Sequence, residues 1–181
     1  MCRRDNSRYC ALGLLSFVGF VLIIVGGATP SWYMREGTLG GGGDFHFGPF
    51  TVCTQSSTSY DECERRDPRD DNMDDSDRAI QAFVLLAILF ALVGAIAGLC
   101  RGCKGTSMRR DGAVLEVLTG VMGVVATAMY IQYVTPNQKC EVIDEAPILD
   151  IKQYTCYWSF ALFVAGWALS LLTAVCMAVV E

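Results

Sequence analysis

Four long windows almost free of charged side chains constrain the fold of this chain more than any other feature. As helices rising about 1.5 Å per residue, all four are long enough to cross a hydrocarbon core of about 30 Å. With 52% apolar and only 18% charged residues, the composition argues against a single water-soluble domain. We therefore predict a mainly α-helical membrane protein with four transmembrane helices, at residues 10–28, 79–100, 113–134 and 157–180.

The first window has one alternative interpretation, a cleaved signal peptide. Arg3, Arg4 and Arg8 precede it, and small residues lie at its end. Its apolar stretch is, however, longer than the roughly 7–15 residues of a signal-peptide core, which favours a membrane helix.

The distribution of charge predicts the orientation of the chain in a membrane. Lys and Arg outnumber acidic residues before the first window and between the second and third, and basic loops remain in the cytoplasm. Acidic residues dominate the other two loops, so we place those outside, in a plasma-membrane protein with both termini in the cytoplasm. The predicted segments are a cytoplasmic N-terminus, outer loop, cytoplasmic loop, outer loop and cytoplasmic end at residues 1–9, 29–78, 101–112, 135–156 and 181.

Four of the nine cysteines fall in the predicted outer loops, where the compartment is oxidising. Three pairings of four cysteines are possible. The simplest joins Cys53 to Cys63 in the first loop and Cys140 to Cys156 in the second.

Four other cysteines lie in or beside the predicted cytoplasmic ends of the windows, namely Cys2, Cys10, Cys100 and Cys103. No second Cys or His pair accompanies the last two on that side, which argues against a zinc site. We interpret these four as palmitoylation sites, with unmodified thiols as the alternative.

The first outer loop changes character along its length. Phe45-His46-Phe47 alternates apolar and polar side chains after a glycine run, Gly40 to Gly43, which favours short strands of a small antiparallel sheet. The stretch from Tyr60 to Asp77 is strongly charged. We expect that stretch to form a solvated loop or a short surface helix.

Polar residues within the windows are few. Glu116 lies near the predicted inner surface, so we expect it to extend toward Arg109 or Arg110, with a proton or ion relay as the alternative. Gln81 and Gln132 lie near the outer ends of their windows and receive no special role.

Small residues occur at helix-packing spacing inside the windows. Gly94 and Gly98 form one such pair, and the fourth window contains two more, Ala161 with Ala165 and Gly166 with Ser170. Such pairs let helices approach closely in lipid, and we assign them to packing within the monomer.

The sequence offers little chemistry for catalysis. His46 is the single histidine, and we find no phosphate-binding loop and no paired-histidine metal motif. The acidic run from Asp70 to Asp77 lacks the glycine and glutamate of a calcium-binding EF-hand loop. We therefore predict no enzyme activity, cofactor or metal site, and expect neither nucleic acid nor a small-molecule substrate as a partner.

The order of landmarks in the first loop resembles the superfamily of claudins, peripheral myelin proteins and calcium-channel gamma subunits. Its members have a tryptophan after the first span, a Gly-Leu-Trp-x-x-Cys motif, a second cysteine, and in claudins an arginine at the second span. Here Pro49 and Phe50 replace the motif's Leu and Trp. The matching residues are Trp32, Gly48, Phe50, Cys53, Cys63 and Arg78.

This resemblance implies a left-handed four-helix bundle with an outer antiparallel sheet, a disulfide joining two strands, and the tryptophan packed beneath them. It also implies that the charge next to the second cysteine, here Glu64, influences ion preference. Acidic side chains along a narrow path would favour cations.

Three functions follow from the resemblance. The first is claudin-like adhesion and barrier formation at cell junctions, through self-association within and between membranes. The second is an auxiliary subunit of a channel or receptor, which the cysteines of the second loop and the acidic stretch favour. The third is a myelin-protein-like organiser of the bilayer, with which the short C-terminal end at Glu181 agrees. Besides Glu64, the candidate selectivity or partner-binding residues are Asp70, Asp71, Asp74, Asp75 and Asp77.

Overall fold

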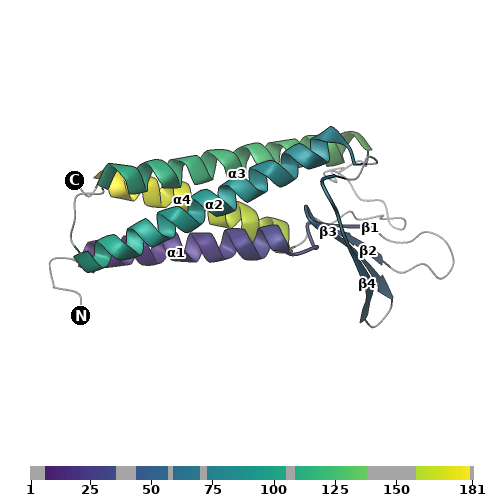
Figure 1. The fold of residues 1–181 in the computed structure, drawn as a ribbon, viewed down its shortest axis with the longest axis horizontal. Coiled ribbons are helices and arrows are strands. Elements are labelled where there is room, and N and C mark those ends of the chain that lie inside the picture. The colour runs from purple at the N-terminus through teal and green to yellow at the C-terminus, as the bar shows by residue number, and fades with distance from the viewer. Residues whose placement is uncertain are drawn as a thin grey trace, which may run out of the picture.

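A bundle of four long helices forms the body of the protein (Figure 1). The computed structural model describes residues 7–35, 44–56, 59–69, 73–104, 109–137 and 158–179. All four helices are long and apolar enough to cross a membrane. Each packs against two others, α1 and α3 both contacting α2 and α4. The helices are α1 (Ser7–Ala28), α2 (Asp75–Lys104), α3 (Arg109–Asn137) and α4 (Trp158–Val179).

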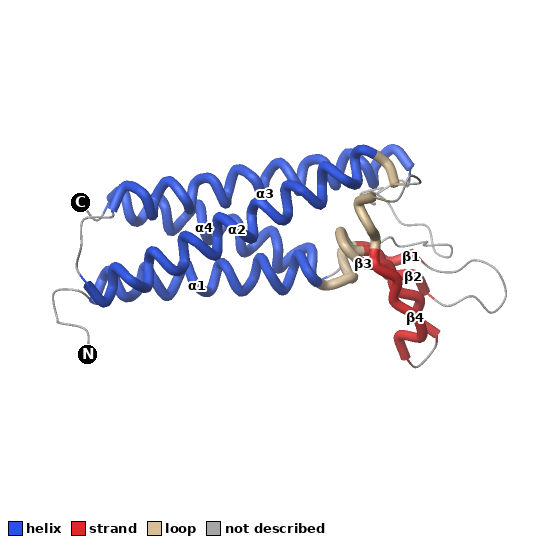
Figure 2. Tube along the Cα trace, in the orientation of Figure 1, coloured by secondary structure: helices blue, strands red, loops and turns tan. Residues whose placement is uncertain are grey.

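A small antiparallel sheet lies at one end of the bundle, opposite the end where α1 begins and α4 finishes (Figures 1 and 2). Its strands pair in chain order, each with the next. They are β1 (Tyr33–Arg35), β2 (Asp44–Phe47), β3 (Thr51–Ser56) and β4 (Ser59–Arg65). The predicted fold class, four membrane helices with a small antiparallel sheet, is therefore confirmed.

The strand predicted at Phe45 to Phe47 is present as β2, whereas Gly40 to Gly43 lie outside the described residues. The prediction for Tyr60 to Asp77 is wrong in its first part, since this segment begins within β4. Its charges are compatible with a strand because, among the described strands, β4 pairs with β3 alone, and charged side chains are common on edge strands. The last acidic residues of the stretch fall in the first turn of α2, where the helix dipole favours negative charge.

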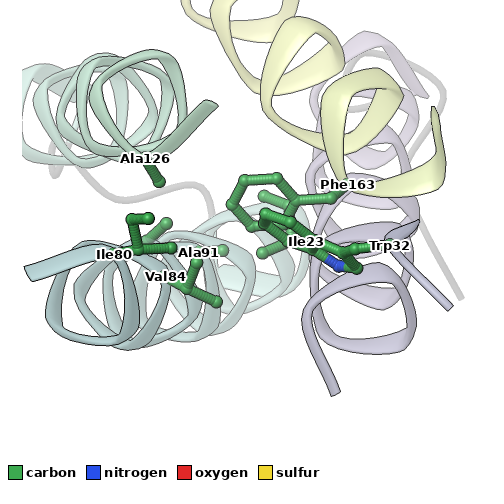
Figure 3. Packing of buried hydrophobic residues seen from close by; sticks show 8 residues of the cluster. Ile23, Trp32, Ile80, Val84, Ala91, Ala126 and Phe163 are labelled. Carbon is green, nitrogen blue, oxygen red and sulfur yellow. The ribbon is translucent and has the colours of Figure 1, made fainter. Parts of the chain in front are cut away.

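The bundle core forms at the end of the helices that carries the sheet, where they meet the first residues after α1 (Figure 1). Figure 3 shows Phe163 and Ile23 beside Trp32, with side chains of α2 and α3 turned toward them. The cluster consists of Ile23, Trp32, Ile80, Val84, Ala87, Ala91, Ala126 and Phe163. Its small members keep the helices close, because packing rather than exclusion of water from between helices holds them together in lipid.

Glycines bring the helix backbones into contact. A Cβ placed on Gly98 would lie 3.2 Å from the Cα of Gly13 in α1, and one on Gly166 would lie 2.8 Å from the backbone nitrogen of Ile23. The close contact of Ser170 with Gly19 belongs to the same α1–α4 interface. These contacts confirm packing inside the monomer for the Gly94–Gly98 and Gly166–Ser170 pairs. The same expectation is wrong for Ala161 and Ala165, which are exposed on α4.

Glu116 does not extend to the surface, so that expectation is wrong. Its side chain is fully buried, and Ser16 of α1 donates a hydrogen bond to it. Gly94 of α2 provides the space, because a Cβ there would lie 3.0 Å from Glu116 Oε1. The carboxyl group therefore points into the bundle.

We expect Gly26→Ala to destabilise the bundle. The added Cβ would lie 2.4 Å from the backbone nitrogen of Phe163, so α1 and α4 must separate. Overpacking of this kind lowers the free energy of unfolding by about 1–3 kcal/mol. Thermal unfolding in detergent or lipid nanodiscs would measure the loss.

Gly112→Ala is the matched control for this substitution. Among the described residues its Cβ would meet only the Sδ of Met177, at an ordinary 3.9 Å, and alanine favours a helix. Its melting temperature should equal or slightly exceed that of the wild type. Equal melting temperatures for both variants would contradict the assigned α1–α4 contact.

Candidate functional site

Trp32 joins the sheet to the bundle. It follows α1 after a short turn, is fully buried, and donates from its indole Nε1 to the carbonyl oxygen of Gly26. Its backbone nitrogen donates to the carbonyl oxygen of Phe47 at the end of β2, 3.0 Å away. The ring also contacts three aromatic rings of α3 and α4, with centroids 4.9, 5.3 and 5.0 Å from Tyr130, Phe160 and Phe163.

Gly48 allows the turn between β2 and β3 to lie directly on the end of α1. A Cβ at this position would lie 2.7 Å from both the Cα of Pro30 and the carbonyl oxygen of Thr29. The Gly48 nitrogen donates to Thr51 across the turn, at 2.8 Å. Phe50 then packs against the bundle core, so this motif fastens the middle of the sheet to the membrane domain.

The disulfide between Cys53 and Cys63 is confirmed and connects β3 with β4. The two residues are direct cross-strand partners, with Cα atoms 4.1 Å apart. Cys53 is buried and Cys63 is exposed, so the bond extends from the sheet core toward its open edge. Cys140 and Cys156 lie outside the described residues.

Gln81 ties α2 to the sheet, so the expectation that it has no special role is wrong. Its buried amide donates to the carbonyl oxygen of Pro49 at 2.7 Å and to that of Arg66 at 3.4 Å. Ser159 of α4 acts similarly by donating to the carbonyl oxygen of Ser31. The sequence offers one signal for this role. Both residues lie near helix ends, where the carbonyl oxygens of adjoining loops need hydrogen-bond donors.

The candidate acidic residues occupy different environments. Asp77 is buried and forms an ion pair with Arg66, just after β4. Asp74 and Asp75 are exposed at the start of α2, and Arg78 contacts Asp75 at 3.4 Å. Asp70 and Asp71 lie outside the described residues.

Glu64 follows Cys63 directly on β4 and is exposed. Its register partner is Val52 of β3. Glu64 therefore lies on the edge strand beside Cys63, with its side chain on the opposite face of the sheet from the disulfide. Asp77 lies at the base of the sheet beside Arg66.

The candidate lipid-modified cysteines also differ. Cys100 is a free, exposed thiol near the end of α2, whereas Cys10 is disulfide-bonded. Palmitoylation of Cys10 would require that bond to be reduced. Cys2 lies outside the described residues, and the position of the Cys103 side chain is likewise not described.

Comparison with known proteins decides the family. The model of the PMP-22/EMP/MP20/Claudin tight-junction family matches residues 17–179. The chain belongs to this family. No individual curated protein matched the sequence.

Membership of the PMP-22/EMP/MP20/Claudin family agrees with the four membrane helices and indicates a multi-pass structural or junction membrane protein. Within the described part of the chain, no group of three or more His, Cys, Asp or Glu side chains is placed to hold a metal ion. The residues that the structure does bring together position the antiparallel sheet on a bundle of membrane helices.

We expect Gln81→Leu to loosen the sheet. The change keeps the side chain similar in size but removes the donor for the carbonyl oxygens of Pro49 and Arg66. Buried polar groups without partners cost about 1–3 kcal/mol. Amide hydrogen exchange at β3 and β4 should accelerate by roughly tenfold.

Gln132→Leu is the matched control, since Gln132 is exposed at the outer end of α3. Its exchange rates in the sheet should equal those of the wild type. If Gln81→Leu also leaves them unchanged, the amide does not anchor the sheet.

Proposed function

We propose that this protein is a claudin-like component of cell contacts, whose outer sheet associates with other copies in its own membrane and in the apposed one. Membership of the PMP-22/EMP/MP20/Claudin tight-junction family supports this function. The excess of Lys and Arg in residues 101–112 supports placing the sheet outside the cell, because it puts the opposite end of the bundle in the cytoplasm.

The attachment of the sheet is the observation that carries the proposal. Hydrogen bonds hold the base of the sheet on the helices. Trp32 donates to the last turns of α1, and Gln81 of α2 and Ser159 of α4 donate to carbonyl oxygens of the turns beside the sheet. A surface held in this way keeps a fixed position and tilt above the membrane. Such preorganisation reduces the entropy lost when copies associate.

Glu64 supplies the proposed preference for cations. It is exposed, lies beside Cys63, and is held on a paired strand instead of a free loop. A fixed negative charge beside a narrow path attracts cations and repels anions where screening by salt is incomplete.

We expect Glu64→Gln to lower the ratio of sodium to chloride permeability roughly twofold, and Glu64→Lys to lower it further, because the field of one exposed charge is modest and screened. The measurement is the dilution potential across an epithelial layer that lacks its own junction strands and expresses each variant. Wild-type protein should concentrate at cell contacts.

Asp67→Asn is the matched control, because Asp67 is equally exposed but lies in the turn after β4. Asparagine can retain the bond that Asp67 accepts from the Arg69 nitrogen at 2.9 Å. Its permeability ratio should remain that of the wild type. Uniform surface staining with unchanged conductance would reject the junction function.

An auxiliary role in a channel or receptor complex is the second candidate. The exposed Asp74 and Asp75 favour it, since they lie where α2 emerges from the bundle and are accessible to a basic partner. Co-purification of a large channel, lost when both are changed to Asn, would support this role. Retention of the same complex by the double variant would assign its binding to other residues.

A further inference from the structure

Glu116 lies where all four helices meet. Ser16 comes from α1, Gly94 from α2 and Ser170 from α4, while Glu116 itself belongs to α3. The side chains of Ser16, Glu116 and Ser170 are at most 1% exposed. This cluster lies within the membrane-spanning stretches and is separate from the outer sheet.

Hydrogen bonding at this cluster is half complete. The Ser16 hydroxyl donates to Glu116 Oε1. The Ser170 hydroxyl lies beside the same carboxyl, yet neither Ser170 Oγ nor Glu116 Oε2 has a hydrogen-bond partner of regular geometry among the described residues. Two arrangements would satisfy both oxygens: Ser170 donates its own hydroxyl hydrogen to an ionised carboxylate, or a protonated Oε2 donates to Ser170.

Nearby buried hydroxyls do not share this shortage. Thr119 donates to the carbonyl oxygen of Leu115 at 2.9 Å, and Thr173 donates to that of Leu169 at 2.8 Å. Both use their own helix, as hydroxyls in apolar helices commonly do. Ser170 instead faces the carboxyl and α1, where Gly19 makes room for it.

Charge balance distinguishes the two arrangements. An ionised carboxyl buried in apolar surroundings is costly unless an opposite charge accompanies it. Among the side chains that the structure describes, the groups facing Glu116 are the hydroxyl of Ser16 from α1, the bare backbone of Gly94 from α2 and the hydroxyl of Ser170 from α4. None of these carries a positive charge.

We propose that Glu116, Ser16 and Ser170 form an intramembrane binding site for a single proton. The proton comes from water and bonds to Glu116 Oε2, which then donates to Ser170 Oγ while Oε1 accepts from Ser16. One new O–H bond therefore removes the net charge and keeps both carboxyl oxygens hydrogen-bonded. Loss of the proton leaves an uncompensated charge between the helices, which links helix packing to protonation of this carboxyl.

Infrared spectroscopy of the full-length protein in phosphatidylcholine vesicles tests the site. At neutral pH the wild type should show the carbonyl stretch of a protonated carboxylic acid, and Glu116→Gln should lose that band. Glu64→Gln is the matched control, because it removes an exposed glutamate of the sheet and should keep the band. Absence of the band from the wild type, or its persistence in Glu116→Gln, overturns the proposal.

Sodium is the competing ligand, since a carboxylate with hydroxyl groups also suits this ion. The spectra are therefore compared in sodium chloride and in choline chloride. A proton site gives the same band in both, whereas a band that appears only without sodium assigns the site to the metal ion and overturns the proposal.

Thermal unfolding provides a second readout. Glutamine reproduces the neutral acid, because its amide can donate to Ser170 while its oxygen accepts from Ser16. Glu116→Gln should therefore melt near the wild type, and Glu116→Ala should melt roughly 5 °C or more below it because it leaves a cavity. If Gln is as damaging as Ala, or prevents folding, the site requires a negative charge and the proposal fails.

Discussion

The position of Trp32 links everything outside the membrane helices to everything within them. Its indole nitrogen donates a hydrogen bond to the last turns of α1, and its backbone nitrogen donates one to the end of β2. Its ring packs against aromatic rings of α3 and α4. An aromatic side chain with one polar atom suits this place, where an apolar interior adjoins hydrated loops. The bonds of Gln81 and the packing of Gly48 and Phe50 add to this attachment.

The same boundary imposes a second requirement, because the loop backbones that enter the apolar region need hydrogen-bond partners. Gln81 and Ser159 supply donors to carbonyl oxygens that turns leave open. The ion pair between Arg66 and Asp77 joins the end of β4 to the first turn of α2. Polar side chains at the helix ends thus complete a connection that apolar packing begins.

The four spans were predictable because bilayer thickness fixes how long an apolar helix must be. β2 was predictable because Phe45 and Phe47 alternate with a polar residue, whereas the charges of β4 concealed a strand held by pairing and a disulfide. The directions of Gln81 and Glu116 could not be deduced from periodicity. A membrane helix is apolar toward lipid and toward its neighbours alike, so its hydrophobic pattern does not distinguish the two faces.

The Cys53–Cys63 bond has a consequence for how the sheet can meet other molecules. It fixes β4 covalently as the neighbour of β3, so an arriving strand cannot take its place there. Strand exchange between two copies, in which each donates β4 to the other, is thereby blocked while the bond is intact. Other molecules must therefore contact the surface or edges of the sheet while its own strand pairing stays unchanged.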